Sequence, residues 1–583
     1  MSRGVAGPGA DAPVRKRARV DAERSEHSGS AGDQARGDEA PVQDAEYWAQ
    51  VANEADAPDN VAGHRDLYLD TVRRRRWEKR ADLVQVNRRL LDFDFEKLCS
   101  VTLSNVNIYA CLVCGRYFQG RGKSTPAYRH SIDEGHRVFM NLETAGVYVL
   151  PDNYQVNDPA LLDIQRQLSL TYSEPQIARL DAPDAHEALD LDAKPYLPGF
   201  VGLNNIGAND YMNVVIQALA HVPPLRNYFL RGGVPRTERA GAGSGGPPSV
   251  TEAAGRLVHS TELVRRFATL VRKLWNPGGF KGQVSPHELL QEVASASQGR
   301  FRLTEQADPV DFLGWLLNRL HADLAGGVSA ARKRRTIITQ CFQGQLRVES
   351  QRVIVRSGIE DEAVVDKLDH DGRRAGGQED EHGRAKFNID QEIRVDHPPF
   401  LMLALDLPPP PVFQDVVKQN IIPQIPLAHV LAKYDGTTIQ EANGMIRRFK
   451  LTKLPPYIIL HFRRFTKNRF VEERNPTIVN FPTVGLDLAE YLEAPADGPT
   501  LGTVYNLLAN VTHEATAGTV RDNSVWRSQV HTRTDGERVS DEDVRREERW
   551  FQMQDLLVDE VNKQMLFLGE SYIQVRPARG RLG

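Results

Sequence analysis

Two cysteines and two histidines in one short stretch have the types and spacing of a metal site. Cys111 and Cys114 form a C-x-x-C pair in YACLVCGRYFQGRG, and His130 and His136 follow. Such a pair offers two thiolates to one ion, and two later histidines complete a tetrahedral shell that suits Zn²⁺. Because all four ligands come from the protein, the pattern predicts one structural zinc ion. The alternative is a reduced, buried cysteine pair beside incidental histidines.

The number and spacing of the cysteines favour structural roles for the two that lie outside the C-x-x-C pair. The 583 residues contain four cysteines, of which Cys99, Cys111 and Cys114 cluster and Cys341 lies far away. This usage argues against a disulfide framework and for a reducing compartment. Cys99 is either a further zinc ligand or a small buried apolar residue. Cys341 precedes an apparent strand and is expected to be a buried structural thiol.

Asp210 lies where a glycine-rich turn meets an apolar helix, in GLNNIGANDYMNVVIQAL. The positive end of a helix dipole favours a carboxylate there, and the side chain can accept backbone N–H bonds. A carboxylate is a poor nucleophile towards an amide, because attack would form a mixed anhydride. The sequence therefore predicts that Asp210 caps the helix and is not a catalyst.

The same stretch resembles the opening motif of the ubiquitin-specific proteases, through Gly202, Leu203, Asn205, Gly207 and Tyr211-Met212-Asn213. In that family a cysteine is activated at this helix N-terminus by a nearby histidine. By the resemblance, the nucleophile position falls on Asp210, and Asn205 matches the side chain that helps to stabilise the oxyanion.

Four later segments resemble the second half of that motif set. They are Tyr505–His513, Asn523–Val530, Trp550–Asp555 and Glu570–Val575. The resemblance places the general-base position on Val525 and the orienting position on Gln554, with adjacent Asp555 leaving the third position open. Valine cannot accept a proton, and losing members of a catalytic unit costs several orders of magnitude in rate. The resemblance thus implies a degenerate protease with no catalytic residues.

The zinc segment resembles the UBP-type zinc finger that accompanies such proteases. Its pocket for the ubiquitin C-terminus cannot be mapped onto this sequence, so ubiquitin binding by the finger is not predicted. From about Asp92 onward, the chain is similar to the non-catalytic splicing members of the family, in which an aspartate occupies the nucleophile position. That resemblance implies a nuclear scaffold that supports the spliceosomal tri-snRNP and pre-mRNA splicing.

The elements that position these residues divide the chain into four parts. Residues 1–66 lack leucine, isoleucine and phenylalanine and predict a disordered tail. Its basic cluster Pro13–Val20 is either a nuclear signal or a solvated charge run. Residues 67–98, rich in Arg, Glu and Leu, predict a charged helical segment. Residues 99–195 hold the finger and a connector, and 196–583 the protease-like domain.

Helical periodicity precedes strand-like segments in the large domain, which predicts an α+β fold. The resemblance to the ubiquitin-specific proteases implies that this fold is papain-like. Helices are expected over Tyr211–Ala220, Leu263–Trp275 and Pro309–Leu324. Three polar or glycine-rich stretches read as insertions, near residues 236–249, 356–386 and 532–549.

Composition limits the function classes. The formal net charge is −4, and no apolar run has the length of a membrane span. No aromatic–basic motif for base-specific RNA binding occurs, so RNA contact is expected to be indirect or to the backbone only, for instance through Arg73–Arg76. The alternatives to a splicing scaffold are a ubiquitin or ubiquitin-like-protein binder, or an unconventional deubiquitinating thiol hydrolase.

Overall fold

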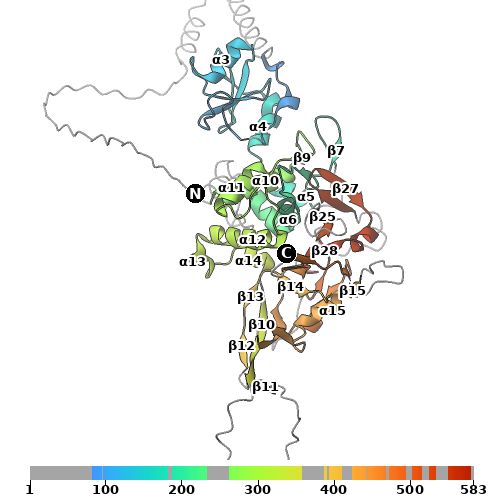
Figure 1. Cartoon of the computed structure of the whole chain (residues 1–583). Helices are drawn as coiled ribbons and strands as arrows, with labels where there is room; N and C mark the ends of the chain where they lie inside the picture. The colour runs from blue at the N-terminus through green and yellow to red at the C-terminus, as the bar shows by residue number, and fades with distance from the viewer. Residues whose placement is uncertain are drawn as a thin grey trace, which may run out of the picture. The chain divides into compact units, whose positions relative to one another are not determined.

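The computed structural model (Figure 1) shows how the sequence motifs are placed. Everything it describes falls in one compact unit, Lys79–Gly583. The tail that was predicted to be disordered, the Arg73–Arg76 run and most of the three predicted insertions lie outside the described residues. Those residues are 82–94, 96–181, 187–232, 261–356, 386–389, 393–409, 423–442, 444–467, 472–493, 502–514, 524–532 and 549–579.

The finger is a small antiparallel sheet with one helix packed beside it. The strand order is β2-β1-β3-β4-β5. Two apolar clusters, one around Val138 and Met140 and one around Phe118 and Phe139, fill its two faces. The elements are β1 (Ile108–Cys111), β2 (Tyr117–Gln119), α3 (Pro126–Asp133), β3 (Val138–Asn141), β4 (Val147–Val149) and β5 (Tyr154–Val156).

The segment before the finger corrects one prediction. A charged helix was expected over 67–98, yet within its described part the chain turns out of helix after Leu83 and holds a single 3-10 helix, η1 (Arg88–Leu90). The remaining described residues of this segment form turns, a bend and irregular structure. Helix propensity is a weak preference that tertiary contacts override, and here Leu91 and Phe93 are buried in the finger core instead.

A connector joins the finger to the large domain. Ser173 and Gln176 form a capping box at the start of its second helix, where the first turn needs hydrogen-bond acceptors. The connector consists of η2 (Pro159–Leu161), α4 (Leu162–Leu168), α5 (Glu174–Arg179) and the hairpin β6 (Ala188–Leu189) and β7 (Pro195–Tyr196).

The large domain begins with helices. All residues of α6 (Asp210–Ala220) are buried, as expected for a helix that is apolar on nearly every side. α12 (Pro309–Ala325) begins at the N-cap Asp308 and ends at Gly326, whose φ is +88°. The other elements of this half are β8 (Gly202–Leu203), α7 (Pro223–Leu230), α10 (Glu262–Leu274), β9 (Gln283–Val284), α11 (His287–Ala296), α13 (Val328–Ala331) and α14 (Ile337–Phe342).

A seven-stranded sheet packs against these helices, in the order β14-β18-β28-β24-β25-β26-β27. Tyr457 and Ile459 of β18 face the helical core, whereas Ile458 and Leu460 face a second core on the other side. The strands are β14 (Leu403–Asp406), β18 (Tyr457–Arg463), β24 (Ala509–Glu514), β25 (Val525–His531), β26 (Trp550–Gln554), β27 (Leu557–Val561) and β28 (Glu570–Pro577).

A second sheet is built around the long strand β10 (Gly344–Arg356), which pairs with β11 (Lys386–Ile389), β12 (Arg394–Asp396), β13 (Pro399–Phe400) and β17 (Met445–Lys453). β17 also pairs with β16 (Gln440–Ala442). The remaining elements are β15 (Gln424–Pro426), α15 (Leu427–Leu431), η3 (Ala432–Tyr434), β19 (Phe465–Lys467), β20 (Glu472–Arg474), β21 (Ile478–Asn480), β22 (Leu486–Asp487), η4 (Ala489–Tyr491), β23 (Val504–Tyr505) and η5 (Lys563–Phe567).

Candidate zinc centre and degenerate protease site

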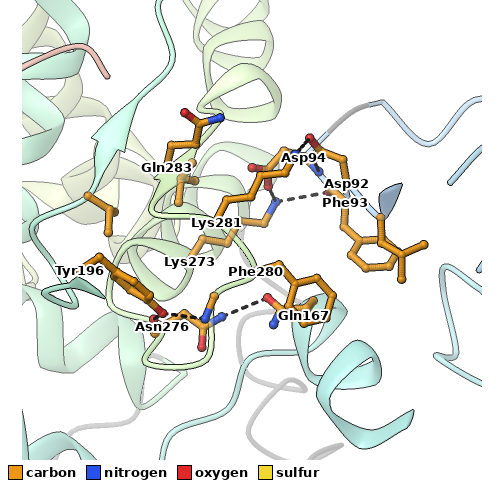
Figure 2. A pocket seen from close by; sticks show the side chains of 14 residues that line it. Asp92, Phe93, Asp94, Gln167, Tyr196, Lys273, Asn276, Phe280, Lys281 and Gln283 are labelled. Atoms are coloured by element: carbon orange, nitrogen blue, oxygen red, sulfur yellow. Dashed lines mark hydrogen bonds and ion pairs between the residues drawn. The ribbon is translucent and has the colours of Figure 1, made fainter. Parts of the chain in front are cut away.

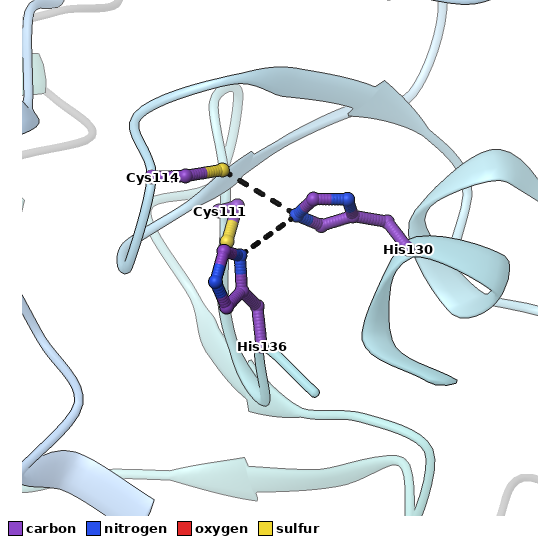
Figure 3. A group of neighbouring side chains, drawn as sticks. All are labelled: Cys111, Cys114, His130 and His136. Carbon is purple, nitrogen blue, oxygen red and sulfur yellow. Dashed lines mark hydrogen bonds between the residues drawn. The ribbon is translucent and has the colours of Figure 1, made fainter. Parts of the chain in front are cut away.

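The structure brings Cys111, Cys114, His130 and His136 together (Figure 3). Their ligand atoms all lie within 4.8 Å of one another. The Sγ atom of Cys114 is 3.4 Å from Nε2 of His130, which is 3.0 Å from Nδ1 of His136. Tetrahedral zinc with two sulfur and two nitrogen ligands needs donor separations of about 3.3–3.8 Å. The two sulfurs and two nitrogens have the chemistry that zinc prefers, and small shifts of the side chains would bring all four donors into this range.

Local structure explains this convergence. Cys111 ends β1, and its N–H and C=O bond to Arg116 and Gly115 across a tight turn. Gly115 has a φ of +75°, a left-handed conformation that a residue with a side chain adopts at a cost. The turn thereby presents Cys114 beside Cys111.

The histidines come from the helix and the loop after it. The ring of His130, in the last turn of α3, stacks on Phe118 with centroids 4.2 Å apart. The hydrogen bond between the two cysteines lowers the pKa of Cys114 and raises that of Cys111, so the pair favours the thiolate on Cys114. A thiolate is the form that zinc binds.

Cys99 lies in the other core of the finger and is not one of the clustered ligands. It is fully buried, and its sulfur accepts hydrogen bonds from the backbone N–H groups of Val101, Thr102 and Gln119 at 3.5, 3.4 and 3.2 Å. Its geometry is that of a buried residue that organises the loop before β1.

The junction at Asp210 departs from the predicted helix cap. The N-cap of α6 is Asn209, and Asp210 is the first helical residue. Asn209 is fully buried, and its Oδ1 accepts hydrogen bonds from the N–H groups of Ile206 and Gly207, at 2.7 and 3.4 Å. Asn209 thus folds the turn back on itself, which leaves the Asp210 side chain to make contacts outside the helix.

Asp210 joins the helix to a distant loop and to the sheet. Nε2 of Gln306 donates to both carboxylate oxygens, at 3.1 and 2.9 Å, and the N–H of Trp526 donates to Oδ2 at 3.4 Å. Ser524 in turn bonds Gln306 at 3.4 Å. Burial raises the pKa of Asp210, and the charge of Asp555 raises it further, against the lowering effect of these donors. Donors therefore contact both oxygens of the carboxylate.

Val525 begins β25, immediately before the Trp526 whose N–H reaches Asp210. Val525, which was predicted for the general-base position, is therefore next in the chain to a residue that contacts Asp210, and its side chain is apolar. Gln306, Ser524 and Trp526 were not predicted as part of this site, because nothing in their local sequence marks them. Their roles arise from contacts over long sequence separations.

At the orienting position of the family motif, the side chains of Gln554 and Asp555 make different contacts. Oε1 of Gln554 accepts a hydrogen bond from Nε of Arg527 at 2.8 Å, away from the junction. Asp555 accepts instead from Nδ2 of Asn205 at 3.0 Å and from Nδ2 of Asn213 at 2.9 Å. Asp555 has a φ of +51°, which lets the chain turn directly after β26. The carboxylate near the oxyanion-type asparagine is thus Asp555.

Cys341 precedes a strand, as predicted: it lies in α14, and β10 begins at Gly344. Only 2% of its surface is exposed, within the main core. Burial raises its pKa to about 12, so the thiol stays protonated.

Acidic residues in front of the finger bind the large domain, a feature that the sequence did not predict. Nζ of Lys273 is 2.6 Å from Oδ1 of Asp94, and Nζ of Lys281 is 2.6 Å from Oδ2 of Asp92 (Figure 2). The N–H of Ser285 donates to Asp94 at 3.0 Å. We name Asp92, Asp94 and Glu96 the acidic strap; its last member, Glu96, contacts His287 and Gln291.

Comparisons with known proteins agree with this arrangement. A family model described as ubiquitin carboxyl-terminal hydrolase matches residues 201–575, and one described as a Zn-finger in ubiquitin-hydrolases and other protein matches residues 99–161. The first match covers more than half of the 583 residues, so the chain belongs to the ubiquitin carboxyl-terminal hydrolase family. The predicted fold, a UBP-type finger followed by a protease-like domain, is confirmed.

Within this family, the chain is similar to the probable mRNA-splicing protein ubp10 of Schizosaccharomyces pombe, with 42% identity over 513 residues that cover 88% of each chain. It is also 42% identical to ubiquitin carboxyl-terminal hydrolase 39 of Homo sapiens, over 84% of this chain and 78% of that one. A crystal structure of an essential yeast splicing factor matches with a TM-score of 0.58 and 27% identity, over 86% of this chain and all of that chain.

Proposed function

We propose that this protein is a non-catalytic, nuclear component of the spliceosome that supports the tri-snRNP and pre-mRNA splicing. Its high similarity to a protein named for mRNA splicing, over most of both chains, supports a splicing role. The fold match to an essential yeast splicing factor adds to that support. No helix among the described residues is long and apolar enough to cross a bilayer.

The hydrogen bonding of Asp210 carries the non-catalytic part of the proposal. The nucleophile position holds a carboxylate whose oxygens are taken up by Gln306 and the Trp526 N–H. The neighbouring Val525 cannot take a proton. A cysteine protease needs a thiol and a base within hydrogen-bond reach of each other, and this junction offers neither. We therefore assign the degenerate positions to Asp210, Val525 and Gln554, with Asn205 retained.

The competing proposal of an unconventional thiol hydrolase finds no support at Cys341. A protonated thiol that is 2% exposed has no access to a substrate and no activating partner. The sulfur atoms of Cys111 and Cys114 belong to the candidate zinc centre, where metal binding would remove them from chemistry.

We further propose that one zinc ion is bound by Cys111, Cys114, His130 and His136. Four protein ligands leave no position for a reacting water, so the ion would stabilise the fold and not catalyse a reaction. It would hold the turn after β1 against α3, an interface that the small finger core supports only weakly.

Affinity purification of the tagged full-length chain from nuclear extract tests the function. We expect co-purification of tri-snRNP proteins and small nuclear RNAs, and no covalent reaction with a thiol-directed ubiquitin probe. Recovery of the chain free of any spliceosomal particle would contradict the splicing role. Reaction with the probe would contradict the non-catalytic assignment, so the two parts of the proposal are tested separately.

A further inference from the structure

Four consecutive cations form an exposed loop at the end of the helical half. Arg332, Lys333, Arg334 and Arg335 connect α13 to α14, and all four side chains are exposed. We call these four residues the basic loop. Figure 1 shows α13 at the outer edge of the helices, beyond α12.

The basic loop differs from nearby arginines in having no acidic partner. Arg300, Arg302 and Arg319 on the preceding elements each pair with a carboxylate, at 3.0, 3.0 and 3.2 Å. Among the described residues, no carboxylate forms an ion pair with any member of the basic loop. The four adjacent positive charges of the basic loop are therefore available to bind an external anion.

The loop is held in a defined conformation by a set of partly buried hydrogen bonds. His321 of α12 spans its base: Nε2 donates to the C=O of Ala331 at 3.0 Å, and Nδ1 is 2.8 Å from Oγ1 of Thr336. The N–H of Lys333 bonds to the C=O of Ala330 at 3.0 Å. Arg334 donates to the C=O of Ala325 at 3.3 Å, at the end of α12. The remaining three cations therefore project from a loop fixed at both ends.

We propose that the basic loop binds the phosphate backbone of RNA. Three of its four cations are arginines, whose planar guanidinium groups match the oxygens of a phosphate. The loop contains no aromatic side chain on which a base could stack, so binding is expected to be independent of base sequence. This inference goes beyond the splicing role, because it concerns a contact that the purified chain makes by itself.

The geometry favours RNA over a nuclear-import receptor. Such receptors read a basic cluster as an extended peptide, as expected for flexible tails. The basic loop spans four residues between two helices and is closed by His321, so it cannot extend without breaking those contacts. A phosphate backbone, in contrast, needs only exposed charges on a rigid surface.

Neutralising the loop tests the proposal. Full-length protein carrying Arg332→Gln, Lys333→Gln and Arg335→Gln keeps Arg334, which caps α12. The matched control carries Arg166→Gln, Arg179→Gln and Lys194→Gln, which remove three exposed cations elsewhere. Binding of a fluorescein-labelled single-stranded oligouridylate is followed by anisotropy over a range of salt concentrations.

We expect the loop variant to bind the oligouridylate about tenfold or more weakly at low salt, and to lose about 2 from the slope of log K against log salt. The control variant should keep most of the affinity. Equal losses in the two variants, or an unchanged slope in the loop variant, would overturn the proposal. So would loop-dependent binding of polyglutamate as tight as that of RNA, or loop-dependent binding to an importin without RNA binding.

His321→Ala separates loop shape from loop charge, since it keeps all four cations. Freeing the loop should weaken RNA binding by about two- to tenfold without changing the salt slope, because ordering the loop then costs free energy on binding. Circular dichroism confirms that the variant is folded. An unchanged affinity in the folded variant would show that the fixed geometry of the loop contributes nothing.

Discussion

The side-chain amide of Asn205 donates a hydrogen bond to the carboxylate of Asp555, 3.0 Å away and 350 positions later in the sequence. Asp555 also accepts from Asn213 of α6. On the same helix terminus, Asp210 is bonded to Gln306 and to the backbone of β25. These polar groups therefore satisfy one another, and their hydrogen bonds join the helices of the large domain to its sheet.

Restoring the thiol alone should not restore activity. In Asp210→Cys, the base position is still Val525, so no group at that position can take the proton of the thiol. We expect no turnover of a ubiquitin–fluorophore substrate above background, even at high enzyme concentration. Thermal unfolding checks that the variant is folded, and an active member of the family serves as the positive control. A measurable rate that depends on the new cysteine would disprove the placement of the base at Val525.

Replacing Asp210 by asparagine should change how stability depends on pH. The pKa of Asp210 is raised in the folded state, mainly by burial. The folded protein therefore binds the proton more tightly than the unfolded chain does. The contribution of Asp210 to the free energy of unfolding is complete below the ordinary aspartate pKa. It is lost as the pH rises through the raised pKa of Asp210 in the folded protein.

Urea unfolding of wild type and Asp210→Asn across the acid-to-neutral range measures this effect. The free energy of unfolding of the wild type, relative to the variant, should be highest at acid pH and fall towards neutrality. A relative stability that rises with pH would mean that the hydrogen bonds from Gln306 and Trp526 outweigh burial and that the pKa of Asp210 is lowered in the folded protein.

Metal analysis of the purified chain should find one zinc ion, and Cys114→Ser or His130→Ala should lose it. Structural zinc contributes on the order of 10 kcal/mol to the folding of small zinc modules, so chelation should unfold the finger. Cys99→Ala is the matched control, because Cys99 accepts three backbone hydrogen bonds outside the cluster. Loss of zinc from that control, or a second bound ion, would contradict the proposed ligand set.

Removing Asp94 should loosen the finger from the large domain. Asp94→Ala deprives both Lys273 and the N–H of Ser285 of their acceptor. The Lys273 and Asp94 side chains are only 15% and 24% exposed, so the expected loss of stability is about 1–3 kcal/mol. Urea unfolding and protection from limited proteolysis in the connector measure it.

Asp396→Ala is the comparison for Asp94→Ala, because its partner Arg394 is 77% exposed. Pairs of that kind contribute less than about 1 kcal/mol. If the two variants lost the same small amount of stability, the acidic strap would contribute no more to stability than an exposed surface ion pair does.

Local patterns predicted what depends on nearby residues. The four candidate zinc ligands lie within one compact segment, and the structure brings them together as their spacing indicated. The start of α6 was found from its glycine-rich turn and apolar run. The match to the family motif singled out the segment Asn523–Val530, and β25 begins within it at Val525.

Contacts between distant residues could not be predicted in the same way. Gln306 has no local signature, since its role depends on a meeting with Asp210 that only the folded chain creates. Gln554 and Asp555 differ by one position, and a positive φ at Asp555 decides which side chain turns inward. The helix expected before the finger fails in its described part because Leu91 and Phe93 are drawn into the finger core.

The acidic strap also bears on where this protein can be cut. A fragment that starts at Cys99, the first residue matched by the finger model, would contain the proposed zinc ligands and the whole degenerate site. It would nevertheless leave Lys273 and Lys281 without the carboxylates of Asp94 and Asp92. A splicing defect in such a truncation could then come from the lost contacts between the finger and the large domain as well as from the deleted residues. Deletion mapping is therefore best begun upstream of Asp82.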